Sequence, residues 1–363
     1  MIGLALSGGG SRAIAFHLGC LRALFDRGVL DRVRLLSGVS GGAVITGLYA
    51  YSEESFEAFD ERVTSVLRRG FNGAIIRHLL SPKLLTQVVA TNVFARPAAV
   101  AARAFGYPPP LRRWASRTDA FEAALRDLFG DLQITDQRRK GVDVVFTSCE
   151  LRSGTAFRFG SRHSGSWRTK SIVGNRISVA HAVAASAAYP LFLPAFDRIY
   201  PFDTGSGSNN RRVVLTDGGV YDNLGVSCME PGRSADISLN VFHPAYIIAC
   251  YAGHGQFDDA VLPYGFVSRL GRALDTTFKR AQDSTMGRLH RYSESGIIKG
   301  FLLPYLGQQD SRLPNAPADL VPREEVSNYP TNFSPMKERD IERLSLRGEQ
   351  LTRVLLAHHC PEL

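Results

Sequence analysis

The sequence lacks an uninterrupted apolar run of the roughly 18 residues that a membrane-spanning helix requires. It also lacks the opening of a secretory signal peptide, because Met1 to Leu6 contains no basic residue and glycines follow at once. These two absences argue against a spanning helix and against a secreted precursor. We therefore expect a cytoplasmic protein, with peripheral association at a membrane for the reason given below.

Cysteine is scarce and scattered. None of the five cysteines lies at the short spacing that is typical of metal-binding pairs, and their number is odd. They are Cys20, Cys149, Cys228, Cys250 and Cys360. We predict reduced, mostly buried thiols rather than a disulfide framework, and we expect no metal and no cofactor.

Acidic residues are missing from one long stretch. Between Arg62 and Arg117 there is no Asp or Glu, whereas the net charge of the whole chain is +9. The stretch holds ten basic residues: Arg62, Arg68, Arg69, Arg77, Lys83, Arg96, Arg103, Arg112, Arg113 and Arg117. This stretch therefore accounts for all of the excess positive charge, and the remainder of the chain is close to neutral.

Residues 52–117 are predicted to form a basic helical cap inserted into the domain. Helices are expected at Phe56 to Leu67, Ile75 to Val89 and Ala95 to Phe105, and Pro108 to Pro110 ends them. Basic residues interleaved with apolar ones suit an anionic phospholipid surface, where each Lys or Arg contributes about 1 kcal/mol. The alternative is a solvated cap whose Arg stems cover apolar surface. Nucleic acid is not expected as a partner, because no recognition motif accompanies the charge. No activating ligand or partner is identified.

A strand, a tight turn and a helix are predicted around Ser40. Val33 to Gly38 has the apolar character of a buried strand, and Gly38 and Gly42 flank Ser40 at equal spacing. This is the G-x-S-x-G pattern of a nucleophile elbow, in which a strand reverses into a helix and exposes a hydroxyl. The start of that helix favours developing negative charge. An ordinary glycine-rich turn would show the same pattern.

A run of three glycines, Gly8 to Gly10, follows the first predicted strand and opens a helix that continues to Arg27. Backbone N–H groups exposed by such a loop bind anions or a developing oxyanion. The run also fits a dinucleotide fingerprint, but that fingerprint requires an acidic residue at the end of the second strand, and that strand leads into Ser40. The strand–helix–strand unit places the glycine loop and Ser40 at the carboxyl ends of neighbouring parallel strands.

A carboxylate follows another predicted strand. Val213 to Thr216 is apolar in character and ends at Asp217, which two glycines follow. A carboxylate at a strand end can reach a neighbouring site, although Asp-Gly is also common in plain turns.

Taken together and in order, four segments resemble the patatin-like phospholipases of the bacterial type. The segments are Gly8-Gly9-Gly10-Ser11-Arg12, Gly38-Val39-Ser40-Gly41-Gly42, Ala185-Ser186-Ala187-Ala188-Tyr189-Pro190 and Asp217-Gly218-Gly219. The resemblance runs from Ile2 to Asn223 and continues more weakly beyond. It implies a three-layer α/β/α fold with a mainly parallel central sheet, and hydrolysis of acyl esters of phospholipids or other lipids.

The resemblance also implies site residues. Ser40 would be the nucleophile and Asp217 its base, in a Ser–Asp dyad without a catalytic His. Gly8, Gly9 and Gly10 would form the oxyanion hole, with Arg12 supporting it. The chain departs from the family pattern at Ser7, where Asp is frequent, and at Ala13, where Gly is frequent.

Two other functions remain open at this stage. His243 and His254 follow Asp217, so the order Ser…Asp…His of a lipase-type triad is available. In typical α/β-hydrolases, however, the elbow follows several strands, whereas here it follows the second. A non-catalytic lipid-binding scaffold is the other option, and the presence of both Ser40 and Asp217 argues against it.

The remaining segments predict one domain over residues 1–363. Residues 201–212, rich in Gly, Ser and Asn, are expected to form a mobile loop. Tyr246 to Tyr251 is predicted as a buried strand, and Ile297 to Leu303 as an edge strand. Residues 336–359 carry apolar positions along one side and are predicted to form a helix that docks on the core.

Overall fold

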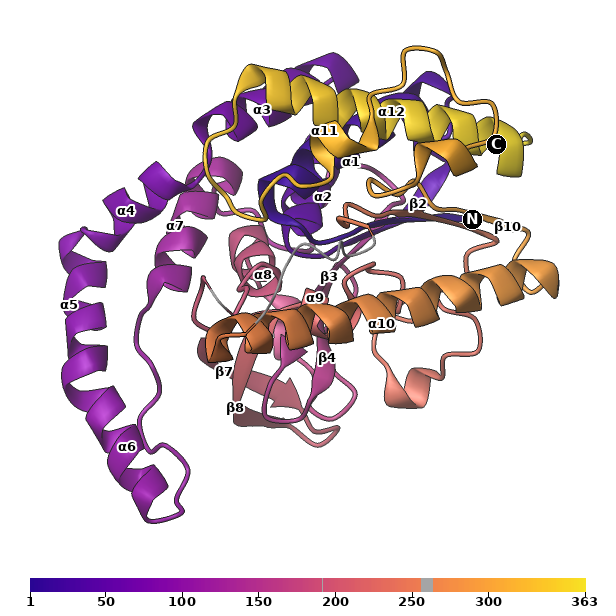
Figure 1. The fold of residues 1–363 in the computed structure, drawn as a ribbon. Helices are drawn as coiled ribbons and strands as arrows, with labels where there is room; N and C mark the ends of the chain where they lie inside the picture. The colour runs from indigo at the N-terminus through magenta and orange to yellow at the C-terminus, as the bar shows by residue number, and fades with distance from the viewer. Residues whose placement is uncertain (191, 256–263) are drawn as a thin grey trace.

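The apolar runs form one mixed sheet in the computed structural model, which describes residues 1–190, 192–255 and 264–363 (Figure 1). Five of its strands are parallel, in the order β10-β9-β1-β2-β3. Their bounds are Ile2–Leu6 for β1, Val33–Gly38 for β2, Asp143–Glu150 for β3, Tyr246–Cys250 for β9 and Gly300–Leu302 for β10. The central strands of the predicted fold are confirmed, with β10 at the sheet edge.

Antiparallel strands extend the sheet beyond β3. They are β4 (Thr155–Gly160), β5 (Ser164–Ser166), β6 (Lys170–Ser171), β7 (Phe196–Asp203) and β8 (Ser208–Asp217). The last residues of β8 pair with the last residues of β3, and Asp217 lies opposite Ser148. This pairing brings Asp217 to the sheet edge at which β2 also ends, since β2 and β3 are parallel neighbours.

Successive side chains along a strand point to opposite faces of the sheet, so the buried apolar residues form two separate cores. Leu4 and Leu6 of β1 belong to one buried cluster, and Ala5 between them belongs to the other. The first core is covered by α1 (Gly10–Asp26), α2 (Gly41–Ala50), α3 (Phe56–Arg69), α7 (Arg117–Phe129), α8 (Val179–Ser186) and α12 (Glu338–His359). The second is covered by α9 (Gly219–Asp222) and α10 (Phe266–Glu294). Helices on both faces of the sheet make the three layers that the sequence predicted.

The C-terminal helix α12 packs against α1, a partner that the sequence analysis did not specify. The two backbones approach so closely that a side chain at Gly19 would place its Cβ 1.7 Å from the Ser345 carbonyl oxygen. A side chain at Gly348 would likewise meet the Phe16 carbonyl at 2.1 Å. Glycine is therefore required on both helices for α12 to cover α1.

The predicted helical cap divides into a packed part and a projecting part. Helix α3 packs on the core, where Phe56 stacks on Phe25 and Phe59 is fully buried. The chain then leaves the core as α4 (Asn72–Leu79), α5 (Pro82–Ala90), a π-helical turn (Thr91–Ala95) and α6 (Arg96–Ala104). Figure 1 shows these helices standing away from the sheet, and we call residues 72–113 the arm. The predicted helix from Ile75 to Val89 is interrupted because Ser81 and Pro82 start a new helix.

Two expectations are wrong. Pro82–Ala104 forms one continuous helical segment that is long and apolar enough, by length and composition alone, to cross a membrane, although no such segment was expected. Residues 201–212 are a hairpin rather than a mobile loop, because Phe202 is buried and pairs with Asn209 across β7 and β8. The glycine and serine residues instead supply its turn, which the Thr204 N–H closes by donating to the Gly207 carbonyl at 3.0 Å.

Candidate active site

Ser40 lies with Val39 in the short turn between a strand and a helix, as the elbow pattern predicts. Strand β2 ends at Gly38, and α2 begins at Gly41. Between them Ser40 has a φ of 53°, a conformation that costs a residue with a side chain on the order of 1–3 kcal/mol. Its N–H donates to Ser186 Oγ at 3.0 Å, and Ser186 Oγ donates to the Thr147 carbonyl at 2.6 Å. Strand β3 and helix α8 therefore hold the strained turn in place.

The two flanking glycines of the elbow leave no room for a side chain. A Cβ on Gly42 would lie 2.0 Å from the Leu6 carbonyl oxygen of β1. A Cβ on Gly38 would lie 2.6 Å from Thr46 Oγ1 and 2.7 Å from the Ala43 Cα. The G-x-S-x-G pattern is thus required by packing against the neighbouring strand and the following helix.

Asp217 ends β8 and is almost completely buried. Its Oδ1 accepts a hydrogen bond of 2.7 Å from the Gly219 N–H. Its Oδ2 accepts no hydrogen bond of standard geometry from any residue that the structure describes. Burial raises the pKa of this carboxyl to about 6, against the opposing effects of the Gly219 N–H and the nearby Ser40 hydroxyl. The structure therefore brings together the two residues that lie 177 positions apart in the sequence.

The glycine loop lies directly against Ser40. A Cβ on Gly8 would be 3.2 Å from the Ser40 Cβ and 2.3 Å from Asn223 Oδ1. The Gly8 N–H donates to the Asn223 carbonyl at 3.1 Å, so it is not free to bind an oxyanion. This corrects the prediction for Gly8: its contribution is to let the loop approach the serine.

The N–H groups of Gly9 and Gly10 have no acceptor among the described residues, so both are free to bind an anion; their place in an oxyanion hole stays a prediction. The N–H of Gly41, the residue after Ser40, is also without an acceptor in the described part of the chain. The sequence analysis did not single out Gly41 as a donor. Its position immediately after Ser40, the candidate nucleophile, is the signal, because the N–H of that residue commonly serves the oxyanion hole at a nucleophile elbow.

Arg12 connects the glycine loop to two later segments of the chain; its predicted support of an oxyanion hole stays a prediction. Its Nε donates to the Ala252 carbonyl at 3.0 Å, and its guanidinium also donates to the Tyr329 carbonyl at 2.7 Å. Its NH2 nitrogen would lie 3.3 Å from a Cβ on Gly9. Burial lowers the pKa of Arg12 to about 10, which leaves the guanidinium charged at neutral pH. Arg12 thus ties the glycine loop to segments near residues 252 and 329.

No histidine is part of this site among the described residues. His254 donates from Nδ1 to the Ser327 carbonyl at 2.6 Å, and its ring lies against the Arg12 guanidinium. Burial and then the charge of Arg12 lower the pKa of His254 to about 4. His243 is exposed, and no hydrogen bond joins either histidine to Ser40 or Asp217 in the described structure. These contacts give no support to a lipase-type triad.

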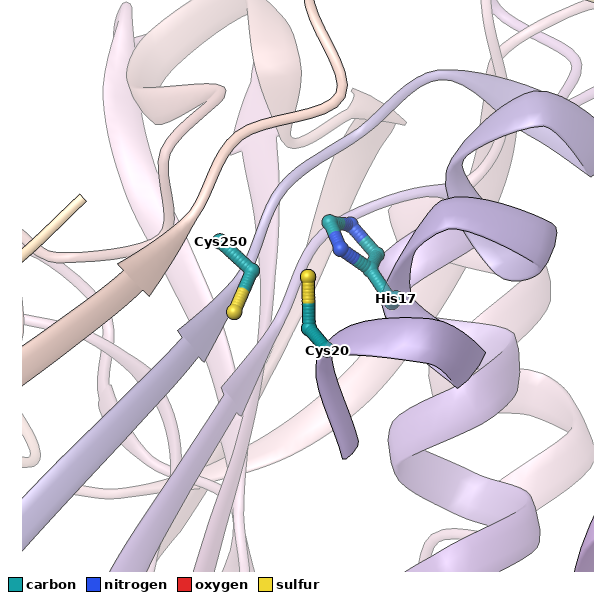
Figure 2. Close-up of side chains that lie close together, drawn as sticks. All are labelled: His17, Cys20 and Cys250. Carbon is teal, nitrogen blue, oxygen red and sulfur yellow. The ribbon is translucent and has the colours of Figure 1, made fainter. Parts of the chain in front are cut away.

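Figure 2 shows a second cluster that the sequence spacing did not group: His17 and Cys20 of α1 beside Cys250 at the end of β9. All three are fully buried, and their ligand atoms lie within 4.8 Å of one another. Bonds of about 2.3 Å to one zinc ion place ligand atoms about 3.8 Å apart, and a closed structural site uses four ligands. The described residues supply three, so this set is an incomplete metal site. All five cysteines are free and buried, as predicted.

Comparison with known proteins fixes the family. A model of the patatin-like phospholipases matches residues 4–227, well over half of the sequence. The chain belongs to the patatin-like phospholipase family.

Solved structures share the fold at low sequence identity. Human GIVD cytosolic phospholipase A2 matches over 98% of this chain and 58% of that chain, at 14% identity and a TM-score of 0.54. Its complex with methyl gamma-linolenyl fluorophosphonate and terbium chloride matches over 98% and 57%, at 13% identity and a TM-score of 0.51. Lysophospholipase NTE1 of Mycosarcoma maydis is 45% identical over 58 residues, which are 16% of this chain and 3% of that protein. The chain therefore spans only part of each of these relatives.

Proposed function

We propose that the protein is a lipid acyl hydrolase of the phospholipase A type, which cleaves carboxylic esters of membrane phospholipids through Ser40 and Asp217. One observation carries the proposal. A serine held in a strained elbow lies beside a buried carboxyl whose pKa is raised to about 6, next to a loop with free backbone N–H groups. These are the nucleophile, base and oxyanion donors that acyl transfer requires.

In the first step Asp217 accepts the proton of the Ser40 hydroxyl while Ser40 Oγ attacks the ester carbonyl carbon. A carboxylate with a pKa near 6 is mostly ionised at neutral pH yet far more basic than an ordinary aspartate, which suits a general base. The N–H groups of Gly9, Gly10 and Gly41, which have no acceptor among the described residues, would bind the oxyanion. In comparable sites, removal of one such donor costs about 3–4 kcal/mol of transition-state stabilisation.

In the second step the tetrahedral intermediate collapses. The bond to the alcohol breaks, Asp217 returns its proton to the leaving oxygen, and the acyl group remains on Ser40. Water then attacks the acyl-enzyme with Asp217 again as the base, which releases the fatty acid and restores the serine.

The names of the relatives support a phospholipid substrate: one is a lysophospholipase and two are structures of a phospholipase A2. We further propose that the protein acts in the cytoplasm at a membrane surface.

The experiment compares the wild type with Ser40→Ala and Asp217→Asn on an activated short-chain ester and on phospholipid vesicles, with products identified by mass spectrometry. A fluorophosphonate probe should label the wild type at Ser40. Both variants should lose ester hydrolysis while circular dichroism shows that they remain folded. Ser37→Ala is the matched control, because Ser37 is a buried serine in β2, the strand that leads into the Ser40 turn.

Three outcomes contradict the proposal. Near wild-type ester hydrolysis by Ser40→Ala would exclude Ser40 as the nucleophile. A Ser-His-Asp triad would be favoured if His243→Ala or His254→Ala remains folded but loses ester hydrolysis, and Asp217→Asn loses it as well. A protein that fails to label and turns over no ester would be a lipid-binding scaffold.

A further inference from the structure

We propose that the arm is an interfacial anchor, which lies on an anionic bilayer with its apolar side chains among the acyl chains. The inference deepens the proposed function by naming the surface through which the enzyme meets its substrate. The binding itself does not require catalysis, so it is tested separately.

The arm exposes far more apolar surface than a solvated helix needs. Only 11% of the apolar window in Pro82–Ala104 is buried. Ten large apolar side chains between residues 76 and 111 are 39–78% exposed: Ile76, Leu80, Leu85, Val89, Val93, Phe94, Val100, Phe105, Tyr107 and Leu111. A concentration of this kind on one element marks an interaction surface.

The apolar residues follow the helical repeat. Leu85, Val89 and Val93 are spaced by four residues, and Val100 follows seven residues later. Residues at these intervals lie along one side of a helix. Leu85, Val89 and Val93 therefore form a short apolar strip, and the same intervals bring Arg96, seven residues after Val89, and Arg103, three after Val100, beside it. Basic residues beside exposed apolar ones suit a helix lying in the plane of a bilayer interface.

The charges of the arm indicate what kind of partner covers the apolar strip. Nearer the core, basic residues are neutralised: Arg62 pairs with Glu54, Arg68 with Glu338 and Arg77 with Asp127. Farther out, Lys83, Arg96, Arg103 and Arg112 are exposed and form no ion pair with a described residue. A second copy of the arm would bring like charges together, whereas anionic headgroups would neutralise them beside the apolar strip.

The geometry favours a helix that lies on the membrane over one that crosses it. The chain leaves the core near residue 71 and returns near residue 115, so both ends of the arm are on the same side. Crossing would place the return segment, which is not helical after Ala104 and contains Pro108, Pro109 and Pro110, in hydrocarbon with its backbone groups unsatisfied. Arg96 and Arg103 would also lie at membrane depth.

The arm is joined to the strand that carries Asp217. Arg212 of β8 donates to the carbonyls of Pro109 at 2.7 Å and Leu111 at 3.0 Å. The Arg113 N–H donates to Asp197 of β7 at 2.8 Å, and Asp197 also pairs with Arg212. The β7–β8 hairpin therefore fixes the orientation of the arm relative to the active site.

Binding is measured with the full chain carrying Ser40→Ala, by flotation with vesicles of phosphatidylcholine alone or mixed with phosphatidylglycerol. The charge variant combines Lys83→Gln, Arg96→Gln and Arg103→Gln. Because each basic residue contributes about 1 kcal/mol near such a surface, partitioning into the mixed vesicles should fall about 100-fold. The control combines Lys140→Gln, Lys299→Gln and Lys337→Gln, three exposed lysines outside the arm, and should bind like the parent.

Insertion is tested with a single tryptophan. Phe94→Trp is placed in a chain that also carries Trp114→Phe and Trp167→Phe, which removes both natural tryptophans. Its fluorescence should be quenched by lipids brominated on their acyl chains. Ile237→Trp in the same background is the control, since Ile237 is exposed outside the arm; it should show no quenching.

The outcomes separate this inference from the proposed function. With Ser40 restored, the charge variant should hydrolyse a soluble ester at the wild-type rate but vesicle phospholipid more slowly. If no ester is hydrolysed by any form, the proposed function fails, while vesicle binding still supports the anchor. Equal vesicle binding by the charge variant and its control overturns the anchor. The anchor is also overturned if the arm instead holds two copies of the chain together. In that case the parent chain would be a dimer, and the charge variant would dissociate it without any loss of vesicle binding.

Discussion

Replacement of Asp217 by Asn should make the folded protein more stable at neutral pH while abolishing hydrolysis. Burial of the carboxyl raises its pKa from the ordinary value of 3.8 to about 6. Below pH 4 the group is largely protonated in both the folded and the unfolded chain. As the pH rises toward 6, the unfolded chain ionises first, so the wild type loses stability over this window.

The size of the effect follows from the two pKa values. A difference of about two pH units corresponds to about 3 kcal/mol at 1.36 kcal/mol per unit. The neutral amide avoids this cost, and its Oδ1 can still accept the hydrogen bond from Gly219. Its NH2 group needs an acceptor that Asp217 did not need, which costs about 1 kcal/mol or more. We expect a net gain of about 1–2 kcal/mol above pH 7 and little difference at pH 4.

The assay is urea unfolding of the wild type and Asp217→Asn across this pH range, followed by circular dichroism. Asp236→Asn, the same substitution at an exposed aspartate, is the control. An Asn variant that is equally stable or less stable at pH 7 would refute the reasoning. So would a gain that is the same at pH 4 and at pH 7, because the electrostatic cost must appear as the carboxyl ionises.

Four further results are expected. The kcat/KM of the wild type on a soluble ester should rise with pH through a single ionisation near pH 6 and then level off, because Asp217 must be deprotonated to act as a base; a flat profile from pH 5 to 8 would contradict this assignment. Gly8→Ala should lower kcat at least 100-fold, because its Cβ would lie 2.3 Å from Asn223 Oδ1 and 3.2 Å from the Ser40 Cβ and would displace the serine. Gly73→Ala is the control, because a Cβ at Gly73 would meet no atom within 4 Å. Ser186→Ala should cost about 1–3 kcal/mol of stability and lower kcat more than it raises KM, because the Ser40 N–H loses its acceptor. Unchanged kinetics would show that the conformation of Ser40 does not depend on this hydrogen bond. Arg347→Leu should destabilise the chain by about 3–5 kcal/mol in urea unfolding, because the buried guanidinium donates to the Leu306, Val321 and Gln308 carbonyls and pairs with Asp310; a loss under 1 kcal/mol would contradict this.

The parallel centre of the fold could be predicted because its strands carry continuous apolar residues and its turns carry glycine. The bounds of β2 match the expected residues, and residues 338–359 form a helix within the segment where the apolar positions predict one. The β7–β8 hairpin could not be predicted in the same way. Asn209 and Asn210 favour turns, and pairing with Phe202 and Pro201 overrides that preference only in the folded sheet.

The site could be predicted in its residues but not in its hydrogen bonds. The pattern around Ser40 specifies an elbow, and the order of the motifs indicates that Asp217 belongs with it. No local pattern shows that the Gly8 N–H is taken by Asn223, because that partner lies more than 200 residues away. The same limit applied to Cys250, which joins His17 and Cys20 only through the pairing of β1 with β9.

The contacts of Arg12 have a practical consequence for any shortened form of the protein. The family match ends at residue 227, yet Arg12 is held by Ala252 and Tyr329, and the Ser11 N–H donates to the Asn332 carbonyl at 2.7 Å. An expression fragment cut at the end of the match would keep Ser40 and Asp217 but lose the contacts that hold the glycine loop. We expect such a fragment to retain the candidate dyad with its loop unsupported, so the last third of the polypeptide is needed to hold the candidate site together.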